Sequence, residues 1–186
     1  MKSTYLARTG IIAALYAALT LVCLTALGGL AWGPVQFRLS ECVCVLALFL
    51  PEAVPGLFIG CIIANLINIP LSGVGLLGLF DVCFGSLATL LAALWIRKFR
   101  NNLFVALLGP VIFNALIVPA YLPILCSGFG FYTIPFTTID VEGAYPLMYL
   151  FGLVATGIGE AVVVYVLGIP LAKALANTSI AKQAHA

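Results

Sequence analysis

Six apolar segments divide the chain, and breaks rich in glycine, proline or charge separate them. A helix that crosses a bilayer needs about 20 predominantly apolar residues, so a chain of 186 residues allows about six. The segments are expected at residues 10–32, 38–51, 54–69, 77–96, 103–126 and 146–171. The pattern therefore predicts an all-α integral membrane protein, with six transmembrane helices in a single domain over residues 1–186.

Composition supports this interpretation and excludes an ordinary soluble domain. Hydrophobic residues make up 64% of the chain and charged residues 8%, whereas soluble domains are about half apolar. The first apolar run, Ile11 to Trp32, is longer than the roughly 7–15 residues of a signal-peptide core. We expect this run to remain in the protein as a helix.

Basic residues predict the orientation in the membrane. Seven of the eight fall at three places, before the first segment, after the fourth and after the sixth. They are Lys2, Arg8, Arg97, Lys98, Arg100, Lys173 and Lys182. With six spans these places share one side, and basic residues favour the cytoplasm. Both termini are therefore expected inside, and Arg38 is the exception on the outer side.

Polar residues concentrate between Gly33 and Glu41, where the second segment begins. Arg38 and Glu41 are three residues apart and would share one face of a helix. A charged residue in an apolar segment is costly to place, and it is a functional-site hypothesis by default. The alternative is a structural ion pair that joins Arg38 to Glu41 or to Asp81.

Further polar residues lie within the other segments, mostly toward the predicted outer side. The candidate binding residues are Gln36, Arg38, Glu41, Asn65, Asp81, Ser86, Asn114, Tyr121 and Glu160. The asparagines, Asn68 among them, could instead serve only as hydrogen-bonding links between helices. Glu160 is harder to explain in that way, because a carboxylate in mid-membrane must be protonated, paired or solvated by a cavity. The set predicts an outward-facing polar pocket and not a continuous pore.

Small residues are spaced for close helix packing. Gly56, Gly60 and Ala64 form one such stripe. In the first segment Ala13, Ala14, Ala17 and Ala18 form two overlapping pairs with a spacing of four. These stripes usually serve internal packing, and a surface for a partner helix is the alternative.

No motif predicts an enzyme, a metal site or a cofactor. The six cysteines lie in or beside apolar segments and lack metal or redox spacing, so we interpret them as small apolar side chains. The chain also lacks the phosphate-binding Gly-x-x-x-x-Gly-Lys-Ser/Thr motif. Any ATP hydrolysis would therefore have to occur on a partner.

Several long strings resemble the QueT family. They are Gly-Pro-Val-Gln-Phe-Arg-Leu-Ser-Glu at 33–41, Pro-Glu-Ala-Val-Pro-Gly-Leu-Phe-Ile-Gly at 51–60, Phe-Asp-Val-Cys-Phe-Gly-Ser-Leu-Ala-Thr-Leu at 80–90, Phe-Asn-Ala at 113–115 and Gly-Glu-Ala-Val-Val-Val-Tyr at 159–165. They keep the family's order and cover nearly the whole chain. Cys42 and Cys44 depart from the pattern, because Ala and Thr would be expected there.

The resemblance implies a function and a set of partners. QueT-like proteins are regarded as substrate-binding S components of energy-coupling-factor (ECF) importers for queuosine precursors. It implies the six-helix S-component fold in a bacterial plasma membrane, a transmembrane coupling subunit and two ATPase subunits. In such systems the alanine stripe of the first helix contacts the coupling subunit, which would assign docking to Ala13, Ala14, Ala17 and Ala18.

The implied ligand is a 7-deazaguanine, a flat base with a hydrogen-bonding edge. Its paired N–H donors suit a carboxylate, and its carbonyl needs a donor such as Gln36, Arg38 or Asn114. Its rings would stack on an aromatic side chain. The candidates for stacking are Phe37, Tyr121, Phe131, Tyr132 and Phe136. The alternatives are an S component for another vitamin or nucleobase, a standalone ion-coupled carrier, and a membrane protein that binds without transporting.

Overall fold

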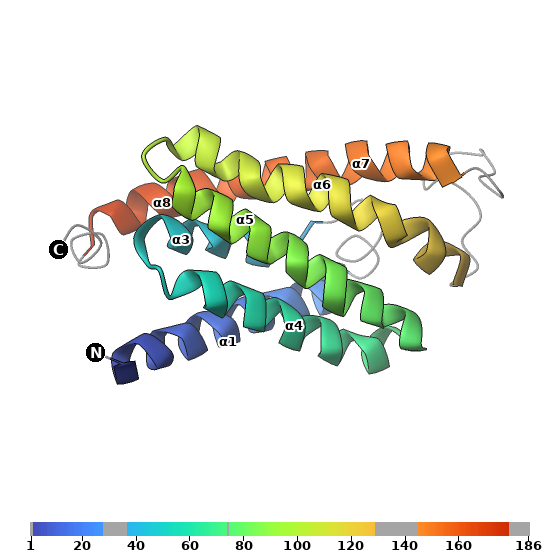
Figure 1. Cartoon of the computed structure of the whole chain (residues 1–186), viewed down its shortest axis with the longest axis horizontal. Helices are drawn as coiled ribbons and strands as arrows, with labels where there is room; N and C mark the ends of the chain where they lie inside the picture. Colours follow the sequence, from blue (N-terminus) through green and yellow to red (C-terminus); the bar gives the residue numbers. More distant parts are fainter. Residues whose placement is uncertain (1, 28–36, 74, 129–144, 179–186) are drawn as a thin grey trace.

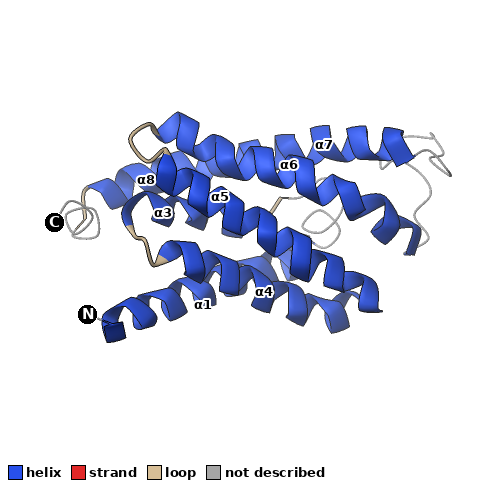
Figure 2. Ribbon diagram, in the orientation of Figure 1, coloured by secondary structure: helices blue, strands red, loops and turns tan. Residues whose placement is uncertain are grey.

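The computed structural model describes residues 2–27, 37–73, 75–128 and 145–178, and these form helices and short connections (Figures 1 and 2). The elements are α1 (Lys2–Leu27), η1 (Leu39–Val45), α3 (Leu46–Phe49), α4 (Ala53–Ser72), η2 (Gly75–Gly78), η3 (Asp81–Gly85), α5 (Ser86–Lys98), α6 (Leu103–Gly128), α7 (Tyr145–Ala161), η4 (Val162–Gly168) and α8 (Ile169–Ala176). No strand occurs within the described ranges. The all-α prediction is confirmed.

Five helical stretches within the described residues are long and apolar enough to cross a membrane. They are Ser3–Leu27, Ala53–Ser72, Gly75–Lys98, Leu103–Tyr121 and Tyr145–Ala176. A shorter apolar helix, Leu39–Phe49, makes a sixth segment. The chain is a multi-pass helical membrane protein.

The short helix formed by η1 and α3 lies inside the bundle. Its eleven residues extend about 20 Å, less than the roughly 30 Å of a hydrocarbon core. Cys44, Val45 and Ala47 are completely buried, and η1 packs against η4 through contacts such as Val45 with Gly168. Arg38, which directly precedes η1, is buried as well. Arg38 and Glu41, predicted at the outer mouth of this segment, therefore lie within the protein.

Polar and apolar side chains are distributed as a lipid-facing bundle requires. Charged and amide side chains such as Arg38, Glu160 and Asn114 are buried. Large apolar side chains such as Ile11 and Val166, which are more than 60% exposed, cover the outside of the bundle. Lipid solvates apolar groups and penalises polar ones, so the polar residues gather between the helices.

Close packing of α1 against α4 explains one of the small-residue stripes. A Cβ atom on Gly60 would lie 2.6 Å from the carbonyl oxygen of Ala13, so only glycine permits this approach. Ala13 and Ala17 are buried on this face of α1, whereas Ala14 and Ala18 are exposed. The exposed pair is the part of the stripe that a partner could reach, and docking there stays a prediction.

The two ends of the described chain lie at the same end of the bundle (Figure 1). The turn between α5 and α6 and the corner between α3 and α4 also lie there (Figure 2). An ion pair between Arg8 and Glu52, with 3.3 Å between Nη1 and Oε1, joins α1 to that corner. We call this the basic end, because the segments that carry Arg8, Arg97, Arg100 and Lys173 meet there. Its assignment to the cytoplasm stays a prediction from the charge pattern.

Candidate ligand-binding site

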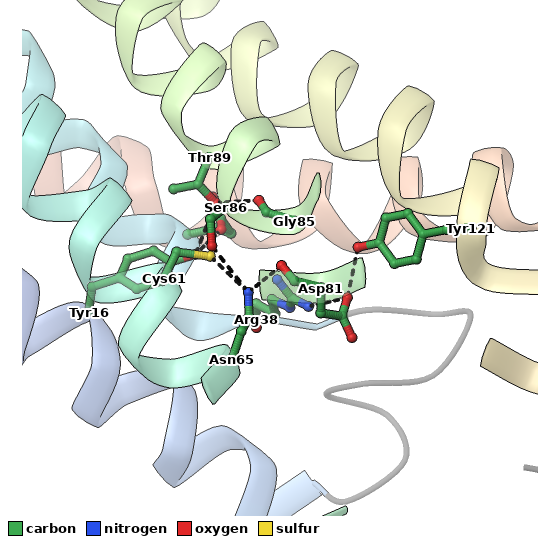
Figure 3. A network of polar contacts seen from close by, with 10 residues as sticks. Tyr16, Arg38, Cys61, Asn65, Asp81, Gly85, Ser86, Thr89 and Tyr121 are labelled. Atoms are coloured by element: carbon green, nitrogen blue, oxygen red, sulfur yellow. Dashed lines mark hydrogen bonds and ion pairs between the residues drawn. The ribbon is translucent and has the colours of Figure 1, made fainter. Parts of the chain in front are cut away.

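A buried ion pair lies at the centre of the candidate site. Arg38 Nη2 is 3.9 Å from Asp81 Oδ1 (Figure 3), and both side chains are buried. Tyr121 of α6 donates its hydroxyl proton to the same Asp81 oxygen at 2.7 Å. Glu41 and Asp81 were the two partners considered for an ion pair with Arg38, and the structure pairs Arg38 with Asp81. The pair joins the start of η1 to η3 and α6.

Glu41 has a different set of partners. Its carboxylate accepts hydrogen bonds from the hydroxyl of Tyr16 and, at 3.2 Å, from the thiol of Cys44. Tyr16 is completely buried and its hydroxyl is also 3.4 Å from Thr89 Oγ1. Figure 3 shows Tyr16 and Tyr121 on opposite sides of Arg38. Glu41 is therefore held by α1 and by its own helix.

Asn65 connects α4 to the beginning of the fourth span. Its amide nitrogen donates to the backbone carbonyl of Asp81 at 2.7 Å and lies 3.4 Å from Ser86 Oγ. Gly85 faces this junction, since a Cβ there would lie 3.3 Å from the Tyr121 hydroxyl and 3.5 Å from the Asn65 amide nitrogen. A glycine at this position lets the polar groups converge.

Two further buried side chains make no hydrogen bond within the described residues. They are Asn114 of α6, through both amide atoms, and Glu160 of α7, through both carboxylate oxygens. Both are only 1% exposed. Buried polar groups are nearly always hydrogen-bonded, and each exception needs an explanation. Among the described residues these two side chains are therefore the ones most in need of further hydrogen-bond partners.

Asn114 and Glu160 are carried by neighbouring helices. Helices α6 and α7 pack along their length, and Gly157 faces Ala115 there. Ala115 follows Asn114, and Gly157 lies one turn before Glu160. The helix of Glu160 continues into η4, which packs against η1, the segment that carries Glu41. The unsatisfied groups thus lie on helices that pack beside the segments of the Arg38–Asp81 pair.

Two π-helical segments shape this region. The first, η3, begins at Asp81, and the second, η4, begins two residues after Glu160. A π-helical turn inserts one residue into an α-helix, which rotates the side chains beyond it, and such turns are frequent at functional sites. Each π segment therefore adjusts the helix that presents one of the buried acids.

Aromatic rings line one side of the site. The rings of Phe80 and Phe84 stack with centroids 6.1 Å apart, and Phe80 stacks on Tyr121 at the same distance. This places an aromatic surface beside the Arg38–Asp81 pair. Phe80 is half-buried and Phe84 is 44% exposed, so this aromatic cluster extends from Tyr121 toward the outside of the bundle.

The structure can be compared with the nine predicted binding residues. Direct contacts join Arg38, Asp81 and Tyr121, as well as Asn65 and Ser86. Glu41, Asn114 and Glu160 are buried in the same bundle. Gln36 lies outside the described residues, as do the predicted stacking candidates Phe131, Tyr132 and Phe136.

Sequence reasoning missed several members of the network. They are Tyr16, Cys44, Cys61, Thr89, Phe80 and Phe84. One signal was available for Tyr16, because a buried tyrosine hydroxyl usually requires a polar partner. Cys44 was interpreted as a small apolar side chain, but its thiol donates to Glu41.

The fold and site define a multi-pass helical membrane protein with a buried polar centre. Comparison with known proteins gives the family. The profile of the QueT transporter family matches residues 6–177, so the chain belongs to that family. The Queuosine precursor transporter QueT of Lactococcus lactis subsp. cremoris (strain MG1363) is 37% identical over 81 residues. The match covers 44% of this chain and 47% of that relative, so it spans about half the relative's length. No solved structure matches the chain with significance.

Proposed function

We propose that the chain is the substrate-binding S component of an ECF importer for queuosine precursors. The family match and the name of the Lactococcus relative support the substrate class. The observation that carries the proposal is the pair of buried polar groups, Asn114 and Glu160, that find no hydrogen bond within the described chain. A 7-deazaguanine base offers the complementary groups.

The chemistry of the base fits the arrangement. Its ring N–H and exocyclic amine form a pair of donors that one carboxylate can accept, and Glu160 has both oxygens available for this role. The Asn114 amide can donate to the ring carbonyl and accept from a second N–H. The rings would then lie near the surface formed by Phe80, Phe84 and Tyr121. A small buried site with a few convergent polar groups is typical of ligand pockets.

The formal charge of the site favours a cationic ligand. Glu41, Asp81 and Glu160 supply three acidic groups against the single guanidinium of Arg38. With all four ionised, the excess is two negative charges in a medium of low dielectric constant. An aminomethyl group on the base would lower this excess. We therefore propose that the amine-bearing precursor is preferred over the neutral base.

Binding measurements on the purified protein test this proposal. A charge-assisted hydrogen bond contributes about 1.5–3 kcal/mol, so the amine-bearing base should bind at least about tenfold more tightly than 7-deazaguanine. Adenine, whose edge presents a different donor pattern, should bind weakly. Equal affinity for all three bases would contradict the proposed recognition.

Transport is proposed to depend on partner subunits, a transmembrane coupling subunit and two ATPases. The buried acids also favour a second candidate, an ion-coupled carrier in which Asp81 and Glu160 exchange protons. Uptake in cells distinguishes the two. The S-component proposal expects uptake to stop when the ATPase genes are deleted. A carrier would continue without the ATPases and stop with an uncoupler.

A further inference from the structure

A cavity lies away from the candidate ligand site, at the basic end. It has a volume of about 250 Å³ and lies between α3, the turn from α5 to α6, and α8. Its lining residues are Leu48, Phe49, Arg100, Asn101, Leu103, Ala172, Lys173 and Ala176. The proposed transport function uses none of them.

Two cations on the rim lack an acidic partner. Arg100 and Lys173 are exposed and form no ion pair with the residues that the structure describes. Among the described residues, the acidic side chain at this end is Glu52, and it is paired with Arg8. Asn101 adds an uncharged donor beside Arg100. The first residue of α6 also lines the cavity, and a helix N-terminus adds partial positive charge.

The rest of the lining is apolar. Leu48 and Ala172 are buried at the cavity, and Phe49 and Leu103 are half-buried. Helix α6 continues from the cavity with Phe104 and Leu108 exposed, four residues apart and so on one face. A ligand that satisfies this surface needs an anionic head and an apolar continuation.

We propose that this cavity binds the phosphate of an anionic phospholipid. The chain is a membrane protein, so the end of its helical bundle lies at the level of the lipid headgroups. Basic pockets between transmembrane helices are known to take anionic headgroups, and each basic residue near the surface contributes about 1 kcal/mol. Arg100 and Lys173 hold the phosphate, Asn101 donates to it, and the acyl chains follow α6.

Lipid titration of the purified full-length protein, followed by native mass spectrometry, tests the proposal. Phosphatidylglycerol should bind with a lower Kd than phosphatidylcholine of the same chain length. Arg100→Gln and Lys173→Gln should each raise the Kd for phosphatidylglycerol by about fivefold. The matched control is Lys98→Gln, which removes an exposed cation at the same end that does not line the cavity.

Each other outcome overturns the proposal. Equal binding of the two lipids would show that only apolar contact matters. An equal effect of Lys98→Gln would show diffuse attraction to the basic end. Complete displacement of phosphatidylglycerol by millimolar inorganic phosphate would assign the cavity to a soluble anion. The comparison of the two lipids uses the unmodified protein, so it decides even if a variant fails to fold.

Discussion

Glu160 is the residue on which the proposed recognition depends most directly. It is 1% exposed, and neither of its oxygens is hydrogen-bonded by a described residue. Removing one charged partner from a buried, hydrogen-bonded pair costs about 2–5 kcal/mol. In the proposed complex the removed partner is the Glu160 carboxylate and the other partner is the ligand. We expect Glu160→Gln to weaken binding of the amine-bearing base by at least about 30-fold. Isothermal titration measures this loss.

The control for Glu160→Gln is Glu52→Gln. Glu52 is also buried, but it pairs with Arg8 at the basic end and is remote from the site. This variant should bind the base with unchanged affinity. Unchanged affinity in a folded Glu160→Gln protein would remove Glu160 from the site.

Arg38 gives a second prediction at this scale. Its planar guanidinium can bond to Asp81 and still offer donors to a ligand carbonyl, which an ammonium cannot reproduce. Arg38→Lys should therefore weaken binding about tenfold, while the protein still melts as a folded unit. A solely structural ion pair predicts the reverse, with normal affinity in Arg38→Lys and a lowered Tm in Arg38→Ala. Affinity and Tm measured on both variants separate the two.

At this scale the sequence predicted residue types better than partners. Charged and amide residues in apolar segments are few, so Arg38, Asp81, Asn114 and Glu160 could be selected from their surroundings alone. Their partners could not, because Tyr16 and Thr89 look like ordinary members of apolar helices. Which carboxylate pairs with Arg38 depends on how helices pack, and sequence spacing does not determine that.

At the scale of the helices, α1 and α4 approach so closely that no side chain fits at Gly60. A methyl group on Gly60 would meet backbone atoms of Ala13 at 2.6 and 3.0 Å. We expect Gly60→Ala to force the helices apart and to lower stability by about 1–3 kcal/mol. Thermal melting in detergent measures this effect. Gly10→Ala on α1 is the control, because no atom lies within 4 Å of its added Cβ, and its Tm should not fall.

The opposite face of α1 carries the docking prediction. Ala14 and Ala18 are exposed, so Ala14→Leu should leave folding and ligand binding unchanged. It should abolish co-purification with the coupling subunit, because a bulky side chain prevents close approach of a partner helix. Ala13→Leu, on the buried face, should instead lower the Tm. Normal assembly and uptake by the Ala14→Leu protein would show that α1 does not dock through this face.

Helix boundaries illustrate why prediction from sequence was uneven. The third segment, predicted over 54–69, appears as α4 over Ala53–Ser72, with Gly73 at a positive φ of 70° after it. The predicted end at residue 69 treated Pro70 as the start of a break, but Pro70 lies inside α4, which ends before Gly73. The π segments η3 and η4 were not predicted, because a one-residue insertion in a helix leaves no clear mark on an apolar sequence.

At the scale of the molecule, the protein places an acidic polar centre inside and a basic end near the two ends of the described chain. The centre gathers Arg38, Asp81 and Glu160 from three separate segments, so it exists only when the bundle is assembled. Hydropathy predicted the number of apolar segments, and the charge pattern predicted which turns share a side. The predicted bounds of 38–51 already made the second segment short, but neither pattern could predict that the other helices enclose it.

The central claim is that the buried site holds a queuosine precursor. Mass spectrometry of small molecules that co-purify with the protein from its membrane tests it most directly. The account predicts that the unmodified protein carries a 7-deazaguanine base, with the amine-bearing form most abundant. It predicts that the Glu160→Gln protein carries no such base. A co-purified molecule of another class, or equal amounts of the base in both proteins, would contradict the account.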